Sequence, residues 1–236
     1  MNTIKRAVIL AGGKGTRLRP YTVVFPKPLM PIGDYPILEV VLRQLVKAGF
    51  NHVTLAVNHQ AELIRAFFGD GSKWNVKIDY SLEREPLGTM GPLKLIPDLP
   101  PNFLIMNGDI LTDLNFQVFY NEHVNSRSAF SISAHIRNLK VDYGVLNADE
   151  NGKLVSFSEK PSHDYLVSMG IYMASSRVLE FIPNGPYGFD NLMLHMIEKS
   201  EAVTVRSHAG YWLDIGRPDD YMQAIDEFDS LKDIFI

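Results

Sequence analysis

The sequence predicts an α/β fold in which a mostly parallel sheet carries helices on both faces. In the first half of the chain, short apolar runs alternate with amphipathic stretches at helical spacing. Strands and helices that alternate in this way form parallel sheets covered on both sides. From about Ser128 the apolar runs follow one another more closely, and this change of pattern predicts a smaller antiparallel part.

The elements of the first half can be predicted in chain order. Residues 7–10 form an apolar run that leads directly into glycines, which predicts a buried strand and a turn. Residues 36–48 carry apolar side chains at helical spacing, with Pro36 suited to the first turn and Gly49 to the C-terminal cap. Further strands are predicted at 52–57, 76–80 and 103–106, and further helices at 61–68 and 91–96.

The second half is predicted to hold three strands and two helices. The strands are expected at 129–136, 143–147 and 154–158, and Asn151-Gly152 favours a tight hairpin between the last two. The helices are expected at 190–199 and 218–228. Because the chain contains no internal repeat or flexible linker, we expect one domain over residues 1–236, with two halves that meet near residue 128.

Composition narrows the class of protein. Hydrophobic residues make up 46% and charged residues 21%, as in ordinary soluble proteins. The net charge of −4 gives no basic field for nucleic acid, and no apolar run approaches the roughly eighteen residues of a membrane span. The absence of cysteine excludes disulfides and thiolate metal sites, and the run 7–11 is too short for a signal-peptide core. We therefore expect a cytoplasmic protein that binds neither nucleic acid nor membrane.

A glycine-rich loop follows the first strand and predicts a phosphate site. Its backbone N–H groups can approach an anion closely, and Lys14, Arg17 and Arg19 add positive charge. The alternative is a tight turn with solvated basic residues. The loop lacks the Gly-Lys-Ser/Thr of a Walker loop, and Leu18 stands where a dinucleotide fingerprint requires a small residue.

A second polar segment is expected beside this loop. Asn107-Gly108-Asp109 follows the strand predicted at 103–106. In open α/β sheets the ligand lies outside the carboxyl ends of the strands. The glycine loop and the Asn107-Gly108-Asp109 corner are therefore predicted to lie at the same edge.

The chain resembles sugar-1-phosphate nucleotidylyltransferases in motifs that follow one another along nearly its whole length. The glycine loop continues into Thr16-Arg17-Leu18, and a second basic motif, Pro26-Lys27-Pro28-Leu29, follows it. Two basic motifs at this spacing are more specific than either alone. The similarity continues through Leu87-Gly88-Thr89, Gly108-Asp109, Tyr143-Gly144-Val145, Glu159-Lys160-Pro161, Gly170-Ile171-Tyr172 and Trp212-Leu213-Asp214-Ile215-Gly216.

The pattern is most similar to mannose-1-phosphate and heptose-1-phosphate guanylyltransferases. The resemblance implies a Rossmann-like nucleotidyltransferase sheet, with a nucleotide-binding half at about 1–127 and a sugar-phosphate-binding half at about 128–236 that contains the small antiparallel part. The chain ends soon after the last motif, so we expect neither an appended β-helix nor acetyltransferase activity.

The resemblance also implies a reaction and its catalytic groups. A sugar 1-phosphate attacks the α-phosphorus of a nucleoside triphosphate and pyrophosphate leaves. Such a transfer depends on positioning and on neutralising charge. Arg17 and Lys27 match the cations on the triphosphate. Asp109 and Asp214 match the ligands of a metal, for which hard oxygen donors and phosphates favour Mg²⁺; each could otherwise be a helix cap or a turn residue.

The nucleotide contacts follow from the same comparison. Glu83 occupies the position that reads the base, where uridylyl and thymidylyl enzymes typically carry glutamine. An ionised carboxylate can only accept hydrogen bonds, and guanine offers two adjacent donors, so GTP is favoured. A uridylyl- or thymidylyltransferase acting on a hexose 1-phosphate is the alternative. The expected nucleotide-binding residues are Leu10, Ala11, Gly12, Gly13, Gly15, Thr16, Glu83, Pro86, Gly88 and Thr89.

The sugar-phosphate site is expected in the second half of the chain. Glu159 would accept from sugar hydroxyls and Lys160 would meet the phosphate, while Gly144 and Gly170 allow close approach of the backbone. Ser168 replaces the asparagine usual in the family, which puts one sugar contact in doubt. Mannose, heptose or another hexose phosphate all fit.

Two other classes of protein are weighed against the enzyme. A non-catalytic sugar-nucleotide-binding regulatory subunit could share the fold, but all the catalytic cations and carboxylates are present. A dinucleotide-dependent oxidoreductase is disfavoured by Leu18. The seven histidines, His59 among them, show no metal-like pairing and are expected to be surface or packing residues. A homo-oligomer is left open.

Overall fold

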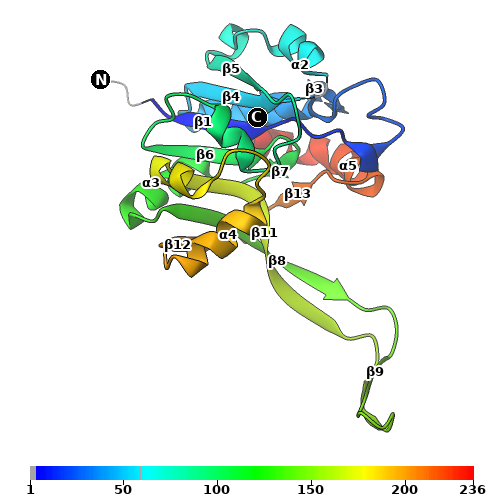
Figure 1. Ribbon diagram of the computed structural model, residues 1–236. Helices are drawn as coiled ribbons and strands as arrows, with labels where there is room; N and C mark the ends of the chain where they lie inside the picture. The colour runs from blue at the N-terminus through cyan, green and yellow to red at the C-terminus, as the bar shows by residue number, and fades with distance from the viewer. Residues whose placement is uncertain (1–3, 59) are drawn as a thin grey trace.

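The computed structural model describes residues 4–58 and 60–236, so the prediction for His59 lies outside the described residues. Figure 1 shows a body built on one twisted sheet and a long hairpin that projects from it. The sheet has seven strands in the order β12-β8-β11-β6-β1-β4-β5. Three two-stranded sheets, β10-β9, β13-β7 and β2-β3, complete the strand pairing of the described residues.

One side of the large sheet is parallel and the other is mixed. β1 (Arg6–Leu10) pairs in parallel with both β4 (His52–Val57) and β6 (Asn102–Asn107), and β5 (Lys77–Leu82) pairs in parallel with β4. β11 (Ser162–Ser175) is antiparallel to both β6 and β8 (Phe130–Lys140), whereas β12 (Val203–Ser207) is parallel to β8. The predicted α/β class with a mostly parallel sheet is confirmed.

Alternation along the central strands divides the core between the two faces of the sheet. In β1, Ala7 and Ile9 belong to one buried cluster and Val8 to another, as the two-residue period of a strand requires. The first cluster packs against α1 (Ile37–Lys47), α2 (Ala61–Phe68) and α3 (Phe116–Ser126). The second packs against α4 (Phe189–Glu198) and the 3₁₀ helices η4 (Gly91–Leu95) and η5 (Ser176–Phe181).

A third buried cluster holds the last helix, α5 (Pro218–Phe235), against the body (Figure 1). Its members include Ile37 and Val40 of α1, Phe228 and Phe235 of α5, and Leu213 of β13 (Trp212–Asp214). The helix predicted at 218–228 extends to Phe235, which is buried beside Phe228.

Several predicted boundaries differ for local reasons. Pro36 pairs with Pro31 between β2 (Pro31–Ile32) and β3 (Tyr35–Pro36), so α1 begins one residue later than predicted. The helix predicted at 91–96 is the 3₁₀ helix η4. The helix α3 was not predicted, because its apolar side chains do not follow a clear helical stripe.

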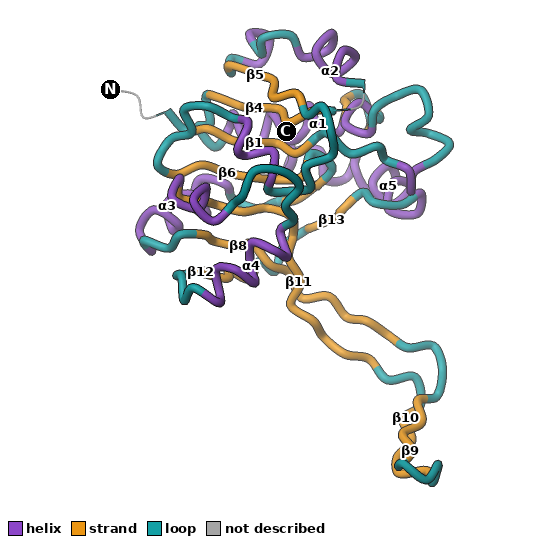
Figure 2. The backbone as a smooth tube through the Cα atoms, in the orientation of Figure 1, coloured by secondary structure: helices purple, strands orange, loops and turns teal. Residues whose placement is uncertain are grey.

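The hairpin predicted around Asn151-Gly152 is confirmed. β9 (Val145–Ala148) and β10 (Leu154–Ser158) are antiparallel, and Gly152 turns the chain at a φ of 79°. The strand predicted at 129–136 is β8, which extends to Lys140 because it pairs with β11 beyond the sheet. We call residues 136–166, the outer part of β8 and β11 with the β9–β10 tip, the arm. In Figures 1 and 2 the arm projects away from the body.

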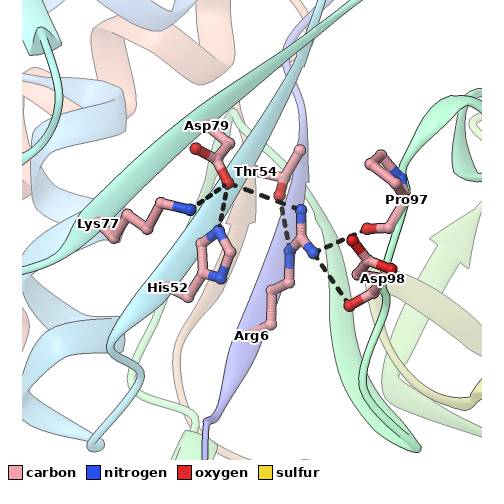
Figure 3. Close-up of polar contacts among 7 residues, drawn as sticks. All are labelled: Arg6, His52, Thr54, Lys77, Asp79, Pro97 and Asp98. Carbon is pink, nitrogen blue, oxygen red and sulfur yellow. Dashed lines mark hydrogen bonds and ion pairs between the residues drawn. The ribbon is translucent and has the colours of Figure 1, made fainter.

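A polar cluster joins the amino ends of the parallel strands (Figure 3). Arg6 Nε donates to Thr54 Oγ1 at 2.9 Å, and its Nη1 donates to the carbonyl oxygens of Pro97 and Asp98 at 3.0 and 3.3 Å. Asp79 contacts His52 Nε2 at 2.6 Å and Lys77 Nζ at 3.0 Å. These contacts connect three strands and the loop before β6.

Among the helices of the described residues, none has both the length and the apolar character that crossing a bilayer requires.

Candidate active site

A cleft of about 650 Å³ lies at the carboxyl edge of the parallel strands. Clefts of this size accommodate small-molecule ligands. Four segments surround it: the glycine loop, the Lys27 turn, the 83–89 segment and the 107–109 corner. Its lining includes Leu10, Ala11, Gly12, Gly13, Gly15, Thr16, Arg17, Lys27, Glu83, Pro86, Gly88, Thr89 and Asp109, all predicted from the sequence.

The glycine loop takes a backbone path that depends on its glycines. Gly15 has a φ of 59°, in the left-handed region, and the Thr22 hydroxyl donates to its carbonyl oxygen at 2.7 Å. A Cβ placed on Gly12 would lie 2.9 Å from Glu83 Oε1 and 3.3 Å from Asn58 Cβ. The absence of a side chain at Gly12 therefore keeps Glu83 next to the loop.

Backbone hydrogen bonds bring three distant segments together beneath the cleft. Gly108 N donates to the Leu10 carbonyl oxygen at 3.0 Å, and Ile215 N donates to the Asp109 carbonyl oxygen at 3.0 Å. β13 pairs with β7 (Ile110–Thr112), which sets Asp214 opposite Ile110. The structure thus places Asp109 and Asp214 close together although more than a hundred residues separate them.

The charged groups at this corner are only partly compensated within the chain. Lys27 Nζ donates to Asp109 Oδ2, whereas Asp109 Oδ1 is buried and has no hydrogen-bond partner among the described residues. Burial raises the pKa of Asp214; the charge of Asp109 raises it further, and Lys27 and Arg17 oppose these effects. The carboxylates therefore lie close enough to repel each other.

Two neighbouring carboxylates with an unpartnered oxygen fit a divalent cation. The free oxygen of Asp109 could ligate a cation, whose charge would relieve the repulsion between Asp109 and Asp214. Within residues 4–58 and 60–236 no group of three or more His, Asp or Glu side chains could hold a metal. Two protein carboxylates alone suit Mg²⁺, which keeps several waters and binds substrate phosphates.

Arg17 completes the cationic side of the cleft. Its guanidinium lies close to Gly216: a Cβ placed on that glycine would be 3.5 Å from Arg17 Nη1. Arg17 thus approaches the Trp212–Gly216 motif from the glycine loop.

Glu83 is the predicted base-reading residue, and it is 7% exposed. Its Oε2 accepts from Leu87 N at 3.2 Å, while burial raises the pKa of the carboxyl. The turn that follows Glu83 packs against Tyr187. Gly88 in this turn has a φ of 75°, and a Cβ there would lie 2.7 Å from the Tyr187 carbonyl oxygen. The Thr89 hydroxyl accepts from Phe189 N at 2.8 Å.

The five predicted sugar-phosphate residues are divided between two places. Ser168 and Gly170 belong to the body: Ser168 Oγ donates to Tyr172 Oη at 3.1 Å, and a Cβ on Gly170 would lie 2.6 Å from Asn107 Nδ2. Gly144, Glu159 and Lys160 lie on the exposed arm. None of the five lines the cleft, so the structure does not bring the arm residues to the nucleotide side within one described chain.

Sequence reasoning missed one residue of the cleft, Asn58, and expected another, Asn107, as part of the 107–109 corner. Asn58 follows β4 directly, and Asn107 is the last residue of β6. Both stand at the carboxyl edge where the glycine loop and Asp109 were expected. The same edge rule, applied to every strand, would have found Asn58 as well.

Comparison with known proteins identifies the family of the chain. Residues 6–230 match the family model described as nucleotidyl transferase, and the chain belongs to this family. The chain is 34% identical to a UTP–glucose-1-phosphate uridylyltransferase of Synechocystis, covering 93% of this chain and 62% of the relative. It is 35% identical to a mannose-1-phosphate guanylyltransferase catalytic subunit beta of Drosophila pseudoobscura pseudoobscura, covering 92% and 60%. The chain thus spans about three fifths of the length of these curated relatives.

Solved structures show the same fold. HddC from Yersinia pseudotuberculosis superposes with a TM-score of 0.73 at 29% identity, covering 95% of this chain and all of the other. The same protein complexed with GMP-PN gives a TM-score of 0.71 at 28% identity. A putative glucose-1-phosphate thymidylyltransferase from Bacillus anthracis, at 22% identity and a TM-score of 0.73, shares the fold.

Proposed function

We propose that this protein is a sugar-1-phosphate nucleotidylyltransferase. A phosphate oxygen of the sugar 1-phosphate attacks the α-phosphorus of a nucleoside triphosphate. The bond from the α-phosphorus to the bridging oxygen of the β-phosphate breaks, and pyrophosphate leaves with that oxygen. The observation that carries this proposal is the convergence of Arg17, Lys27 and the Asp109–Asp214 pair beside a glycine loop.

The chain's own groups account for the demands of this reaction. Backbone N–H groups of the glycine loop hold the triphosphate, and Arg17 and Lys27 stabilise the charge that moves onto the leaving pyrophosphate. Lys27 contacts Asp109, and this contact would hold its ammonium beside the triphosphate. Asp109 and Asp214 would hold Mg²⁺, which neutralises phosphate charge when bound.

GTP is the proposed nucleotide. Glu83 lies in the cleft, buried and with one oxygen engaged by Leu87 N, so an ionised carboxylate there requires further donors. Guanine supplies two, its ring N–H and its amino group. The uridylyl alternative keeps independent support, because one of the relatives described above is named for UTP. A cytoplasmic location is part of this proposal.

The test is pyrophosphate release with Mg²⁺ across GTP, UTP, dTTP, CTP and ATP, each combined with mannose, glucose and heptose 1-phosphates. Release with GTP and one sugar phosphate is the expected result. Release with a pyrimidine nucleotide would keep the reaction and discard the role of Glu83. Nucleotide binding without release from any pair would instead favour a regulatory subunit.

Two variants assign the roles in this assay. Asp109→Asn should abolish metal-dependent release with the fold intact, whereas Asp233→Asn, on an exposed position of α5, should have no effect. Glu83→Gln should lower the preference for GTP over UTP, because an amide can also donate. An unchanged ratio of kcat/KM for the two nucleotides would remove Glu83 from base reading.

A further inference from the structure

Asn58 lies in the cleft beside Glu83, although no motif of the sequence marks it. It directly follows β4 and belongs to the lining of the cleft, and Glu83 directly follows β5. The two strands are parallel, with Val57 opposite Leu82. The Glu83 N–H donates to the Val57 carbonyl oxygen at 2.9 Å, which continues the pairing by one residue. Asn58 and Glu83 therefore leave the sheet side by side.

Gly12 shows how close these two side chains are to each other. A Cβ on this glycine would lie 2.9 Å from Glu83 Oε1, 3.3 Å from Asn58 Cβ and 3.4 Å from Asn58 N. The Glu83 carboxylate and the base of the Asn58 side chain therefore approach the same point, which the glycine leaves open. A carboxamide is attached directly to the Cβ of asparagine, so that of Asn58 lies near any ligand that binds Glu83.

The two side chains offer a ligand different hydrogen-bonding groups. An ionised carboxylate can only accept, whereas a carboxamide donates through its NH₂ group and accepts through its oxygen. One oxygen of Glu83 accepts from Leu87 N at 3.2 Å and the other carries further lone pairs, while Asn58 is half-buried. The pair can therefore present acceptors at one position and a donor at the next.

Guanine is the base whose edge complements this pair most completely. Its Watson–Crick edge presents the O6 acceptor, the ring N–H and the amino group in a row, and the last two match the carboxylate. Uracil has an acceptor on each side of its ring N–H, so one of its carbonyl oxygens would face the carboxylate. Adenine has only its amino group as a donor on this edge, so it would satisfy the carboxylate with one hydrogen bond in place of two.

We propose that Asn58 is a second base-reading residue, whose carboxamide NH₂ donates to O6 of guanine while Glu83 accepts from the ring N–H and the amino group. The inference rests on the proposed function, since it assigns a contact to the nucleotide of that reaction. Glu83 alone supplies no donor for O6, and a buried oxygen without a donor weakens binding. The two residues together therefore discriminate against the other bases more strongly than Glu83 does alone.

Binding of GTP and of two analogues tests this contact without reference to turnover. In 6-thio-GTP a sulfur atom, which accepts only weakly, replaces O6, whereas ITP lacks only the amino group. In calorimetric titrations without a sugar phosphate, Asn58→Ala should bind GTP about 10-fold more weakly than the wild type does. Its loss for 6-thio-GTP should be much smaller, because that analogue makes little use of the donor. The ratio of its affinities for GTP and ITP should stay at the wild-type value, because the amino group faces Glu83.

Three further variants separate base reading from a structural role. Asn58→Asp keeps the size of the side chain but cannot donate, so its preference for GTP over 6-thio-GTP should fall as in Asn58→Ala. Glu83→Gln should instead lower the preference for GTP over ITP. Asn121→Ala, at an exposed position of α3 outside the cleft lining, should bind all three nucleotides as the wild type does. An unchanged thermal transition would show that each variant folds.

The outcomes distinguish a failure of this contact from a failure of the proposed function. Equal losses for GTP and 6-thio-GTP in Asn58→Ala would assign Asn58 a structural role and overturn the proposal. A wild type that binds UTP more tightly than GTP would also overturn it, while pyrophosphate release would still support the reaction. A wild type that releases no pyrophosphate from any substrate pair, but shows the expected pattern of binding losses, would refute the proposed function and keep the base contact.

Discussion

The charged side chains at the two ends of the parallel strands differ in how completely they are paired. At the amino ends, Arg6 and Asp79 meet partners from neighbouring strands and from the 97–98 loop (Figure 3). At the carboxyl ends, Asp109 Oδ1 has no partner within the described residues, and Asp214 faces a second carboxylate. The charged side chains at the amino end stabilise the fold through contacts within the chain. Those at the carboxyl end are incompletely paired and are available to a ligand. Substitutions at the two ends should therefore have separate effects on stability and on rate.

The largest effect is expected from Arg17→Ala. Loss of one cation that stabilises the leaving group costs about 10²- to 10³-fold in rate. The free energy of unfolding should change by no more than about 0.5 kcal/mol, because the Arg17 side chain is exposed. Arg84→Ala, at an exposed position outside the cleft lining, is the control. Equal rates for the two variants in the pyrophosphate assay would contradict the role of Arg17.

The next effect concerns the stability of the body in acid. His123 is 2% exposed, its Nδ1 contacts Ser131 Oγ at 2.8 Å, and burial lowers its pKa to about 4. The folded state therefore binds this proton less readily than the unfolded chain, whose histidine pKa is about 6.5. Stability should fall as the pH drops below about 6.5 and level off below about 4, by a total of about 3 kcal/mol.

His123→Gln should remove this part of the pH dependence. Urea unfolding at several pH values should show a smaller loss in the variant than in the wild type. His52 at the amino end, whose pKa is lowered mainly by burial, should account for a smaller share, which His52→Gln would measure. His163→Asn, at an exposed position, serves as the control. If His123→Gln lost as much stability in acid as the wild type, the buried neutral state would be wrong.

A smaller effect on stability is expected from Arg6→Met at the amino end. The substitution leaves the carbonyl oxygens of Pro97 and Asp98 without their donor, which costs about 1–3 kcal/mol. Nucleotidylyl transfer by the folded protein should keep its wild-type kcat/KM. A large loss of rate with unchanged stability would contradict the conclusion that the amino end contributes to stability and the carboxyl end to rate.

The smallest effect is expected from Lys77→Ala. Its ion pair with Asp79 is exposed at the lysine, whose side chain is 65% accessible. Pairs of this kind contribute about 0–1 kcal/mol and are screened by salt. The difference in unfolding free energy from wild type should therefore shrink further in high salt. A loss as large as that of Arg6→Met would show that the cluster depends on Lys77.

Much of the site could be predicted because it follows directly from strand ends. Gly12, Gly15 and Asp109 each come just after a buried apolar run, and the edge rule for α/β sheets places them together. Asn107 was expected there as part of the 107–109 corner, whereas Asn58 obeys the same rule and was missed only because no motif marked it. The helix α3 could not be predicted, because packing on the sheet, rather than a clear apolar stripe, stabilises it.

The sequence by itself determined the alternation of elements, the glycine loop and the carboxyl edge at which the cleft forms, because apolar period and turn chemistry are local properties. Only the tertiary structure decided that Asp214 meets Asp109, through the pairing of β13 with β7. It also decided the pairing of β8 with β11, whose register shifts between Ser168 and Tyr172. Such pairings depend on segments far apart in the chain, and no local pattern specifies them.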